Sequence, residues 1–200
     1  MYRVYGMRSS GNCYKVYLAA KQLGLPFEWV ETNIMQGATR TLEFLAMNPN
    51  GKVPTLEIEP GKYLPESNAI LYFLADGTPL LPTDRYQRAQ VLQWLFYEQY
   101  SHEPYVAVAR FIIYFLGNPP ERRTDLEMRQ KRGYQAFDVM EKHLFANDYF
   151  VANRYTIADI ALYAYTHVAD TGGFDMSGYP RVNAWLERVK AQPGYVTMEG

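Results

Sequence analysis

The N-terminal part of the chain alternates between short runs typical of strands and a longer run typical of a helix. Residues 2–5 and 27–30 alternate between polar and apolar side chains, which predicts two β-strands. The run between them predicts a helix that stops at Gly24, because apolar side chains recur at helical spacing, at Cys13, Val16, Leu18, Ala19 and Leu23.

Residues 48–70 predict a turn, a β-hairpin and the start of a helix. Three consecutive turn formers open this stretch, and strand-like alternation begins after Pro54. Pro60-Gly61 marks the hairpin turn, and a helix is expected over residues 68–75. With a short helix over 39–45, the order β-α-β-α-β-β-α predicts a mixed sheet flanked by helices.

The pattern is helical almost to the end of the chain beyond residues 77–84, a stretch with Gly, two Pro and no periodicity that is typical of a linker. Long helices are expected over 85–116 and 121–145, and Pro104 should kink the first of them. A Thr156–Asp159 capping box marks a further helix start, and 180–191 predicts the last helix. We therefore expect an α/β domain over residues 1–76, the linker over 77–84 and an all-α domain over 85–200.

Composition narrows the class of protein. The net charge of −1 favours neither nucleic acid nor anionic membrane as a partner. No long uncharged apolar run occurs, so we expect neither secretion nor a membrane span. The single Cys excludes an intrachain disulfide and a Cys-based zinc site. We expect a cytoplasmic protein without a metal centre.

Two features of the 48–70 stretch carry chemistry. If the Val53-Pro54 bond were cis, the Val53 main chain would face outward and could pair with an extended peptide; a trans bond is the simpler alternative. At the helix start, the Ser67 hydroxyl and backbone N–H groups can bind a carboxylate, while Glu66 can hold an ammonium. The two together suit the zwitterionic end of an amino acid, although Ser67 alone is typical of an ordinary N-cap.

This run, NPNGKVPTL followed by PESNAI, resembles the most recognisable stretch of glutathione S-transferases, and the similarity covers nearly the whole chain. The resemblance implies a thioredoxin-like N-terminal domain, an all-helical C-terminal domain, glutathione as co-substrate, a homodimer and a role in detoxification. It assigns the cysteinyl backbone of glutathione to the Val53 main chain and the γ-glutamyl end to Glu66 and Ser67. Lys52 is the expected partner of the glycyl carboxylate, with Arg40 or Thr39 in reserve.

The turn RSSGNCYKV is where these transferases keep the group that activates the glutathione sulfur. Ser10 aligns with the catalytic Ser of theta- and zeta-like classes, and Asn12 with the Asn of the bacterial Nu-like class. Ser9 is the alternative, because a shift of one residue exchanges the two serines. Tyr5 is a further alternative by similarity to the Tyr classes, and all three polar residues of the turn could simply cap a helix. Cys13 is expected to be buried and inert.

The resemblance thus implies an enzyme that stabilises the glutathione thiolate and conjugates it to a small hydrophobic electrophile. Glutathione-dependent reduction of peroxides or disulfides is one alternative, and a non-catalytic glutathione- or ligand-binding protein is another. The second substrate would lie between the domains, against a stripe of the long helix formed by Tyr97, Tyr100, Ser101, Pro104, Tyr105 and Val108. Core packing explains such a stripe equally well.

Overall fold

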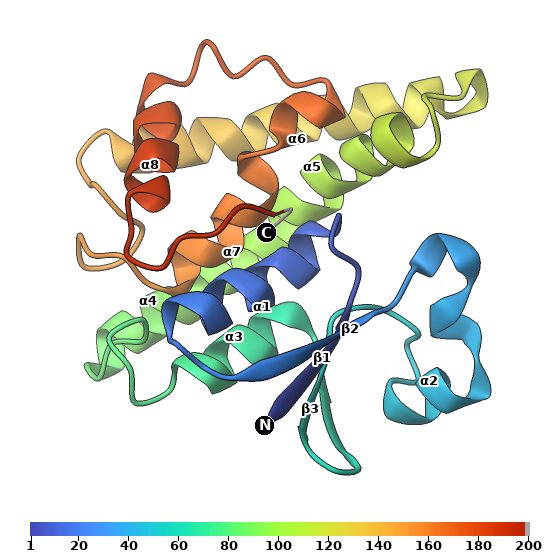
Figure 1. Cartoon of the computed structure of the whole chain (residues 1–200). Helices are drawn as coiled ribbons and strands as arrows, with labels where there is room; N and C mark the ends of the chain where they lie inside the picture. The colour runs from blue at the N-terminus through green and yellow to red at the C-terminus, as the bar shows by residue number, and fades with distance from the viewer. Residues whose placement is uncertain (199–200) are drawn as a thin grey trace. The chain divides into compact units, whose positions relative to one another are not determined.

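A four-stranded mixed sheet with the order β2-β1-β3-β4 forms the base of the first unit. In this computed structural model, which describes residues 1–198, β1 (Tyr2–Gly6) pairs in parallel with β2 (Phe27–Glu31) and antiparallel with β3 (Thr55–Glu59) (Figure 1). The hairpin strand β4 (Lys62–Pro65) pairs antiparallel with β3 at the edge. The mixed sheet expected from the sequence is confirmed.

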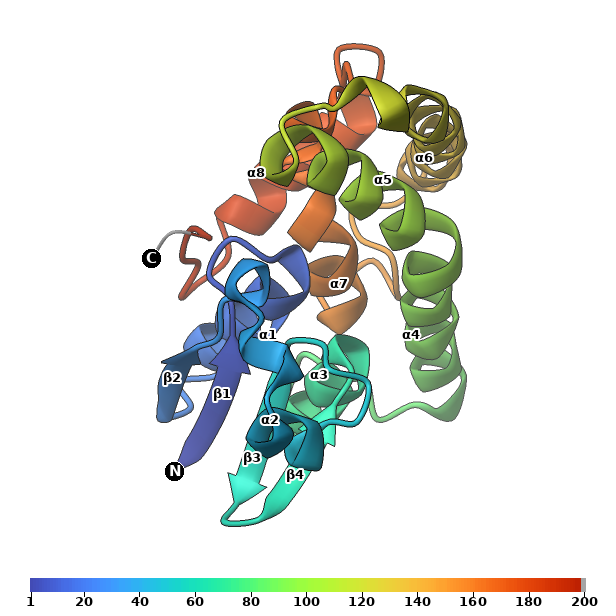
Figure 2. The same cartoon turned by 90° about the vertical axis from the view of Figure 1, so that its right-hand side faces the viewer.

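Helices α1 (Gly11–Gln22) and α3 (Ser67–Ala75) pack side by side on one face of this sheet. Their apolar side chains meet those of the strands in one core, formed by Val4, Val16, Leu56, Ile70 and Leu74. The short helix α2 (Leu42–Met47) starts after a 3₁₀ turn and is capped by Thr41, whose hydroxyl accepts from the Phe44 N–H. Figure 2 shows α1 and α3 together behind the strands. The core therefore holds both of these helices against the same face of the sheet.

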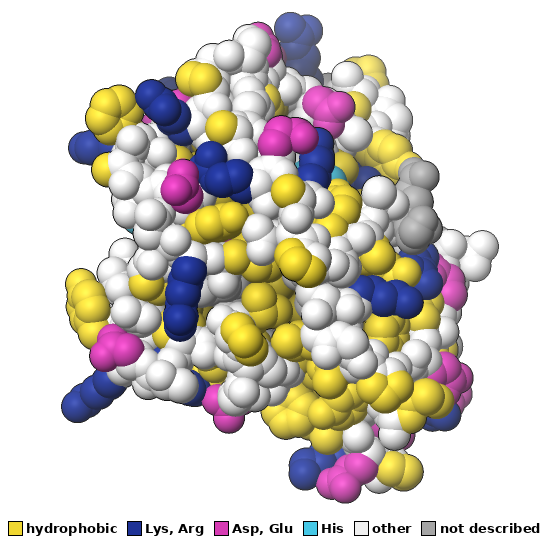
Figure 3. Space-filling model, turned by 60° about the vertical axis from the view of Figure 1, so that its left-hand side comes forward, with side chains coloured by type: hydrophobic (Ala, Val, Ile, Leu, Met, Phe, Trp, Pro, Cys, Tyr) yellow, Lys and Arg dark blue, Asp and Glu magenta, His cyan; other side chains and the backbone are white. Residues whose placement is uncertain are grey.

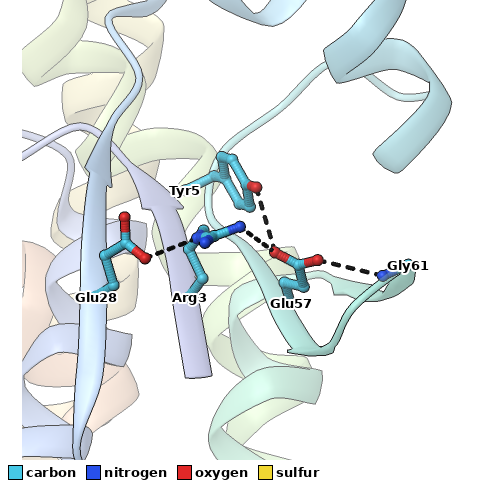
Figure 4. Close-up of polar contacts among 5 residues, drawn as sticks. All are labelled: Arg3, Tyr5, Glu28, Glu57 and Gly61. Carbon is cyan, nitrogen blue, oxygen red and sulfur yellow. Dashed lines mark hydrogen bonds and ion pairs between the residues drawn. The ribbon is translucent and has the colours of Figure 1, made fainter. Parts of the chain in front are cut away.

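The opposite face of the sheet carries a polar network centred on Glu57 (Figure 4). Val4 points into the core, so Arg3 and Tyr5 project to the other side of β1. The buried Glu57 carboxylate accepts from Arg3 Nη1 at 3.0 Å, from the Tyr5 hydroxyl at 3.3 Å and from the Gly61 N–H at 3.2 Å. Arg3 also pairs with Glu28 at 2.8 Å. The network thus ties the β3–β4 hairpin to both parallel strands.

The second unit, Leu80–Gln192, is helical. Its first helical stretch comprises α4 (Arg85–Tyr97) and α5 (Glu103–Arg110), with π-helical turns at Glu98–His102 and Phe111–Phe115. The first π turn ends at His102, two residues before Pro104, which lacks the N–H that would bond the Tyr100 carbonyl. A widened turn accommodates such a defect. The expected long helix is therefore present, but interrupted by π turns.

The rest of this unit contains α6 (Arg123–Leu144), α7 (Ile157–Thr166) and α8 (Pro180–Lys190). Every residue of α7 is buried. The capping box is confirmed: Thr156 Oγ1 accepts from the Ala158 N–H, and the Asp159 carboxylate accepts from the Thr156 N–H at 2.9 Å. Asp159 also accepts from Trp185 Nε1 at 3.0 Å, which links α7 to α8.

Residues 193–198 group with the first unit, Met1–Pro79, whereas the sequence analysis expects them in the helical domain. One physical reason is a hydrogen bond of 2.7 Å from the Tyr14 hydroxyl to the Val196 carbonyl. Within residues 1–198, none of the helices combines the length and the apolar character needed to cross a bilayer. On the face drawn in Figure 3, basic and acidic side chains are interspersed, in keeping with the net charge of −1.

The buried capping carboxylate predicts a pH dependence of stability. Burial raises the pKa of Asp159 to about 6, although hydrogen bonds from Trp185, Thr156 and Phe150 act in the opposite direction. An Asp in the unfolded chain has a pKa near 3.9. Between these values the folded chain keeps a proton that the unfolded chain has lost, so raising the pH favours unfolding. Relative to Asp159→Asn, we expect the unfolding free energy of the wild type to fall by up to about 3 kcal/mol between pH 4 and pH 7.

Denaturant unfolding at a series of pH values measures this difference. Asp76→Asn, which removes an exposed carboxylate, is the matched control and should keep the slope of the wild type. A wild-type curve that runs parallel to that of Asp159→Asn over the whole range would contradict the prediction.

Candidate functional site

The starts of α1 and α3 lie against each other in the first unit. Ser67, the first residue of α3, donates its hydroxyl to Asn12 Oδ1 in the first turn of α1, over 3.3 Å. Each helix start carries free N–H groups and the positive end of a helix dipole. The contact therefore brings together two of the residues singled out in the sequence, at a place suited to negatively charged groups.

Ser10 is the N-cap of α1, with extended backbone angles (φ −86°, ψ 124°). Its Oγ accepts from the Cys13 N–H at 3.4 Å. A hydroxyl that accepts in this way still has its own hydrogen to donate. The capping role is thus observed, and it is compatible with donation to a ligand at the start of the helix.

Hydrogen bonds and cation–π contacts stabilise the turn that carries Ser10. The Ser10 N–H donates to the Met7 carbonyl at 3.0 Å, and the Arg8 N–H donates to Glu31 Oε1 at 3.4 Å. The Arg8 guanidinium lies over two rings, 4.2 Å from the Tyr17 centroid and 4.6 Å from that of Trp29. A cation–π contact is worth about 0.5–1 kcal/mol at an exposed site. The two contacts of Arg8 therefore favour one conformation of the turn.

The competing candidates near this turn are placed differently. The Tyr5 hydroxyl donates to Glu57 within the network of Figure 4. The Cys13 side chain is fully buried, its sulfur accepts from the Met7 N–H at 3.4 Å, and burial raises the pKa of its thiol to about 12. Such a thiol is neutral at physiological pH and enclosed, which agrees with the expectation that Cys13 is inert. Ser9 is half-buried beside Ser10.

The Val53-Pro54 peptide bond is cis, as the sequence analysis allows. Asn48 fixes the preceding turn: its Nδ2 donates to the Lys52 carbonyl at 2.9 Å and to Thr55 Oγ1 at 3.2 Å. Within the part of the chain that the structure describes, no protein group forms a hydrogen bond with the Val53 main chain. Its N–H and carbonyl are available to an extended ligand.

Two cationic residues flank the same turn. The Lys52 side chain is exposed, and the Arg40 guanidinium lies over Gly51, where a Cβ would come within 2.5 Å of Arg40 Nη1. Gly51 also has a φ of +61°, which favours glycine. Lys52 and Arg40 both remain candidates for binding a carboxylate, whereas Thr39 is buried.

The start of α3 differs from the expectation in one respect. Glu66, rather than Ser67, is the N-cap residue, and its side chain does not cap the helix. Glu66 is exposed and has a φ of +70°. A non-glycine residue in this region is strained by about 1–3 kcal/mol, and such residues cluster at functional sites. Because the Glu66 side chain does not cap α3, its carboxylate can bind a ligand.

The sequence analysis missed Lys15 and Asn68. Lys15 is fully buried, and its Nζ donates to Ser67 Oγ at 3.3 Å and to Asn68 Oδ1 at 3.4 Å. One signal was present: Lys15 is a single cation among the apolar residues of CYKVYLAA. Helical periodicity, however, assigns such a residue to the solvent side.

Part of the stripe predicted along the long helix borders a hollow within the helical unit, with a volume of about 340 Å³. The stripe residues that line it are Tyr97, Tyr100, Ser101 and Tyr105, and the other lining residues lie on α6 and include Val139. Pro104 and Val108 are not among the lining residues. Among residues 1–198 there is no group of His, Cys, Asp and Glu side chains arranged to hold a metal ion.

Comparisons with known proteins match both units. The family model described as "Glutathione S-transferase, N-terminal domain" matches residues 1–76, and that described as "Glutathione S-transferase, C-terminal domain" matches residues 105–193. A crystal structure of a glutathione S-transferase from Pseudomonas fluorescens Pf-5 is 58% identical, with a TM-score of 0.98 over 100% of this chain and 99% of that one.

Two further relatives bear on chemistry. A glutathione transferase family member from Pseudomonas fluorescens Pf-5, solved with two glutathione molecules bound, is 28% identical with a TM-score of 0.85 over 96% of this chain and 89% of that one. The disulfide-bond oxidoreductase YfcG of Escherichia coli K12 is 28% identical over 91% of this chain and 87% of its own length.

Proposed function

The chain belongs to the glutathione S-transferase family, and from this premise we propose that it binds glutathione along the starts of α1 and α3 and the turn before Pro54. It is a glutathione transferase. The observation that carries the assignment of the site is the hydrogen bond between Asn12 and Ser67. It joins the residues proposed for the sulfur to those proposed for the γ-glutamyl end.

Each part of glutathione has a proposed partner of suitable chemistry. The γ-glutamyl carboxylate accepts from the Ser67 hydroxyl and the N–H groups at the start of α3, and its ammonium pairs with Glu66. The cysteinyl backbone pairs with the open main chain of Val53. The glycyl carboxylate binds Lys52 or Arg40. A related structure with glutathione bound supports the choice of ligand.

The reaction requires the thiolate of glutathione. The Ser10 hydroxyl and the Asn12 amide donate to the sulfur, and the α1 dipole favours its negative charge. Each unit by which they lower the thiol pKa corresponds to about 1.4 kcal/mol. The thiolate then attacks an electrophilic carbon, a C–S bond forms, and the leaving group departs with its electron pair. The rest of the rate enhancement comes from holding glutathione and the electrophile in reactive positions.

A second candidate activity is reduction of a disulfide, which the relative YfcG favours. In that reaction the thiolate attacks one sulfur of the disulfide, a mixed disulfide forms, and the other sulfur leaves as a thiolate. A second glutathione then releases the remaining thiol and forms oxidised glutathione. The same Ser10 and Asn12 stabilise the attacking sulfur, so the two activities differ only in the second substrate.

We propose a homodimer that uses the hollow of the helical unit. Three large apolar side chains of α4, the π turn that follows it and α6 are exposed: Tyr100 is 83% exposed, Phe96 69% and Val139 47%. Tyr100 and Val139 border the same hollow. An exposed apolar surface of this kind is typical of an interaction site, and a second copy of the chain is the partner that membership of the family suggests.

We also propose a cytoplasmic location and a role in detoxification.

Removal of the Ser10 hydroxyl should raise the thiol pKa of bound glutathione. A hydrogen bond to a charged group is worth about 1.5–3 kcal/mol, so we expect Ser10→Ala to lower kcat/KM about 10- to 100-fold at neutral pH. Asn12→Ala should act in the same direction, and the thiolate absorbance of bound glutathione against pH measures the shift. Ser9→Ala is the matched control. A dead Ser9→Ala beside an active Ser10→Ala would show that the alignment is wrong by one residue.

The choice between transfer and reduction is tested with three substrates. An aryl halide, a hydroperoxide and a mixed disulfide are assayed with glutathione under identical conditions. Conjugation of the aryl halide with no turnover of the disulfide supports the transferase proposal, and the reverse supports the reductase. Loss of each measured activity on Ser10→Ala is expected in either case, because both need the thiolate.

The dimer proposal predicts a molecular mass of twice 23.2 kDa by light scattering after gel filtration. Val139→Glu places a charge in the apolar surface and should shift the protein to the monomer, because burial of an unpaired charge is costly. Leu42→Glu, at an exposed leucine of α2, is the control and should leave the mass unchanged. A monomeric wild type at micromolar concentration would refute the proposal.

A further inference from the structure

Lys15 is a fully buried cation in the first half of α1. Burying a charged group is costly unless hydrogen bonds and charges around it compensate. A buried Lys therefore depends on the groups that its ammonium contacts. Its Nζ reaches Ser67 Oγ at 3.3 Å and Asn68 Oδ1 at 3.4 Å, both in the first turn of α3.

The contact fixes how the Ser67 hydroxyl is used. A hydroxyl has one hydrogen to donate and two lone pairs to accept with. Because the Lys15 ammonium has only hydrogens, Ser67 Oγ must accept from it. The single hydroxyl hydrogen is thereby directed away from Lys15, and in the structure it points to Asn12 Oδ1 at 3.3 Å.

We propose that Lys15 is a positioning residue that sets the γ-glutamyl end of the glutathione site through Ser67. This inference rests on the proposed function, because that function assigns the γ-glutamyl carboxylate to Ser67. The ammonium holds the Ser67 oxygen and polarises its O–H bond, which makes the hydroxyl a stronger donor. When the γ-glutamyl carboxylate binds, that hydrogen turns from Asn12 to the carboxylate.

The Lys15 contact acts on one end of the ligand. A thiol that lacks the γ-glutamyl group brings no carboxylate to Ser67 and leaves the Ser67–Asn12 bond in place. Lys15 therefore favours glutathione over shorter thiols.

The test compares glutathione with cysteinylglycine, which lacks the γ-glutamyl group, in the wild type and in Lys15→Met. We expect Lys15→Met to weaken glutathione binding about 10- to 100-fold and to change cysteinylglycine binding less than twofold. Isothermal titration gives both dissociation constants. Lys21→Met, an exposed lysine of the same helix, is the matched control and should bind both thiols as the wild type does.

A merely structural role would weaken both ligands equally and leave their ratio unchanged, which would overturn the proposal. Ser67→Ala gives an independent readout: if Lys15 acts through Ser67, the double variant should bind glutathione no more weakly than Ser67→Ala alone. Additive losses would also overturn it. Lys15→Arg keeps the charge and should recover part of the preference for glutathione, and it carries the test if Lys15→Met does not fold.

Failure of this inference differs from failure of the proposed function. A wild type that does not bind glutathione refutes both. A wild type that binds glutathione with a high preference over cysteinylglycine, and a folded Lys15→Met that keeps the same preference, refutes only the role of Lys15.

Discussion

Two helices from different parts of the first unit begin at one place because α1 and α3 both bury apolar side chains against β1 and β3. That packing holds the two helices side by side. Two positive helix ends converge there, and they meet through Ser67 and Asn12. The arrangement favours negative charge before any ligand is considered. The γ-glutamyl carboxylate and the thiolate are the two negative charges of glutathione that we propose to bind there.

Contacts outside the helix starts stabilise the turns and strands that carry the rest of the proposed site. Asn48 fixes the turn that ends at the cis peptide bond, and Arg8 stacks on two rings beside the turn that carries Ser10. The Glu57 network on the other face of the sheet keeps β3 and β4 in register with β1. The Arg8–Trp29 and Arg3–Glu57 contacts join segments that are distant in sequence, whereas Asn48 acts within its own turn. A ligand would therefore meet a surface whose parts are already in place.

Features with a local cause could be predicted from the sequence. The Thr156–Asp159 box and the hairpin turn at Pro60-Gly61 depend on side chains a few residues apart, and both occur where expected. Lys15 could not be predicted in this way, because its burial depends on α3, which lies far away in the chain. The same holds for Glu66, whose positive φ results from the path between β4 and α3. Periodicity describes one element at a time and is silent about contacts between elements.

The bond from the Tyr14 hydroxyl to the Val196 carbonyl has a consequence for biosynthesis. Tyr14 belongs to the helix that carries Asn12, whereas Val196 follows the whole helical unit in the chain. On the ribosome, the thioredoxin-like unit emerges first, yet this tether forms only after translation has passed the last helix. The unit is therefore assembled from segments on both sides of the helical unit, and its final contact is made after the helical unit has been synthesised.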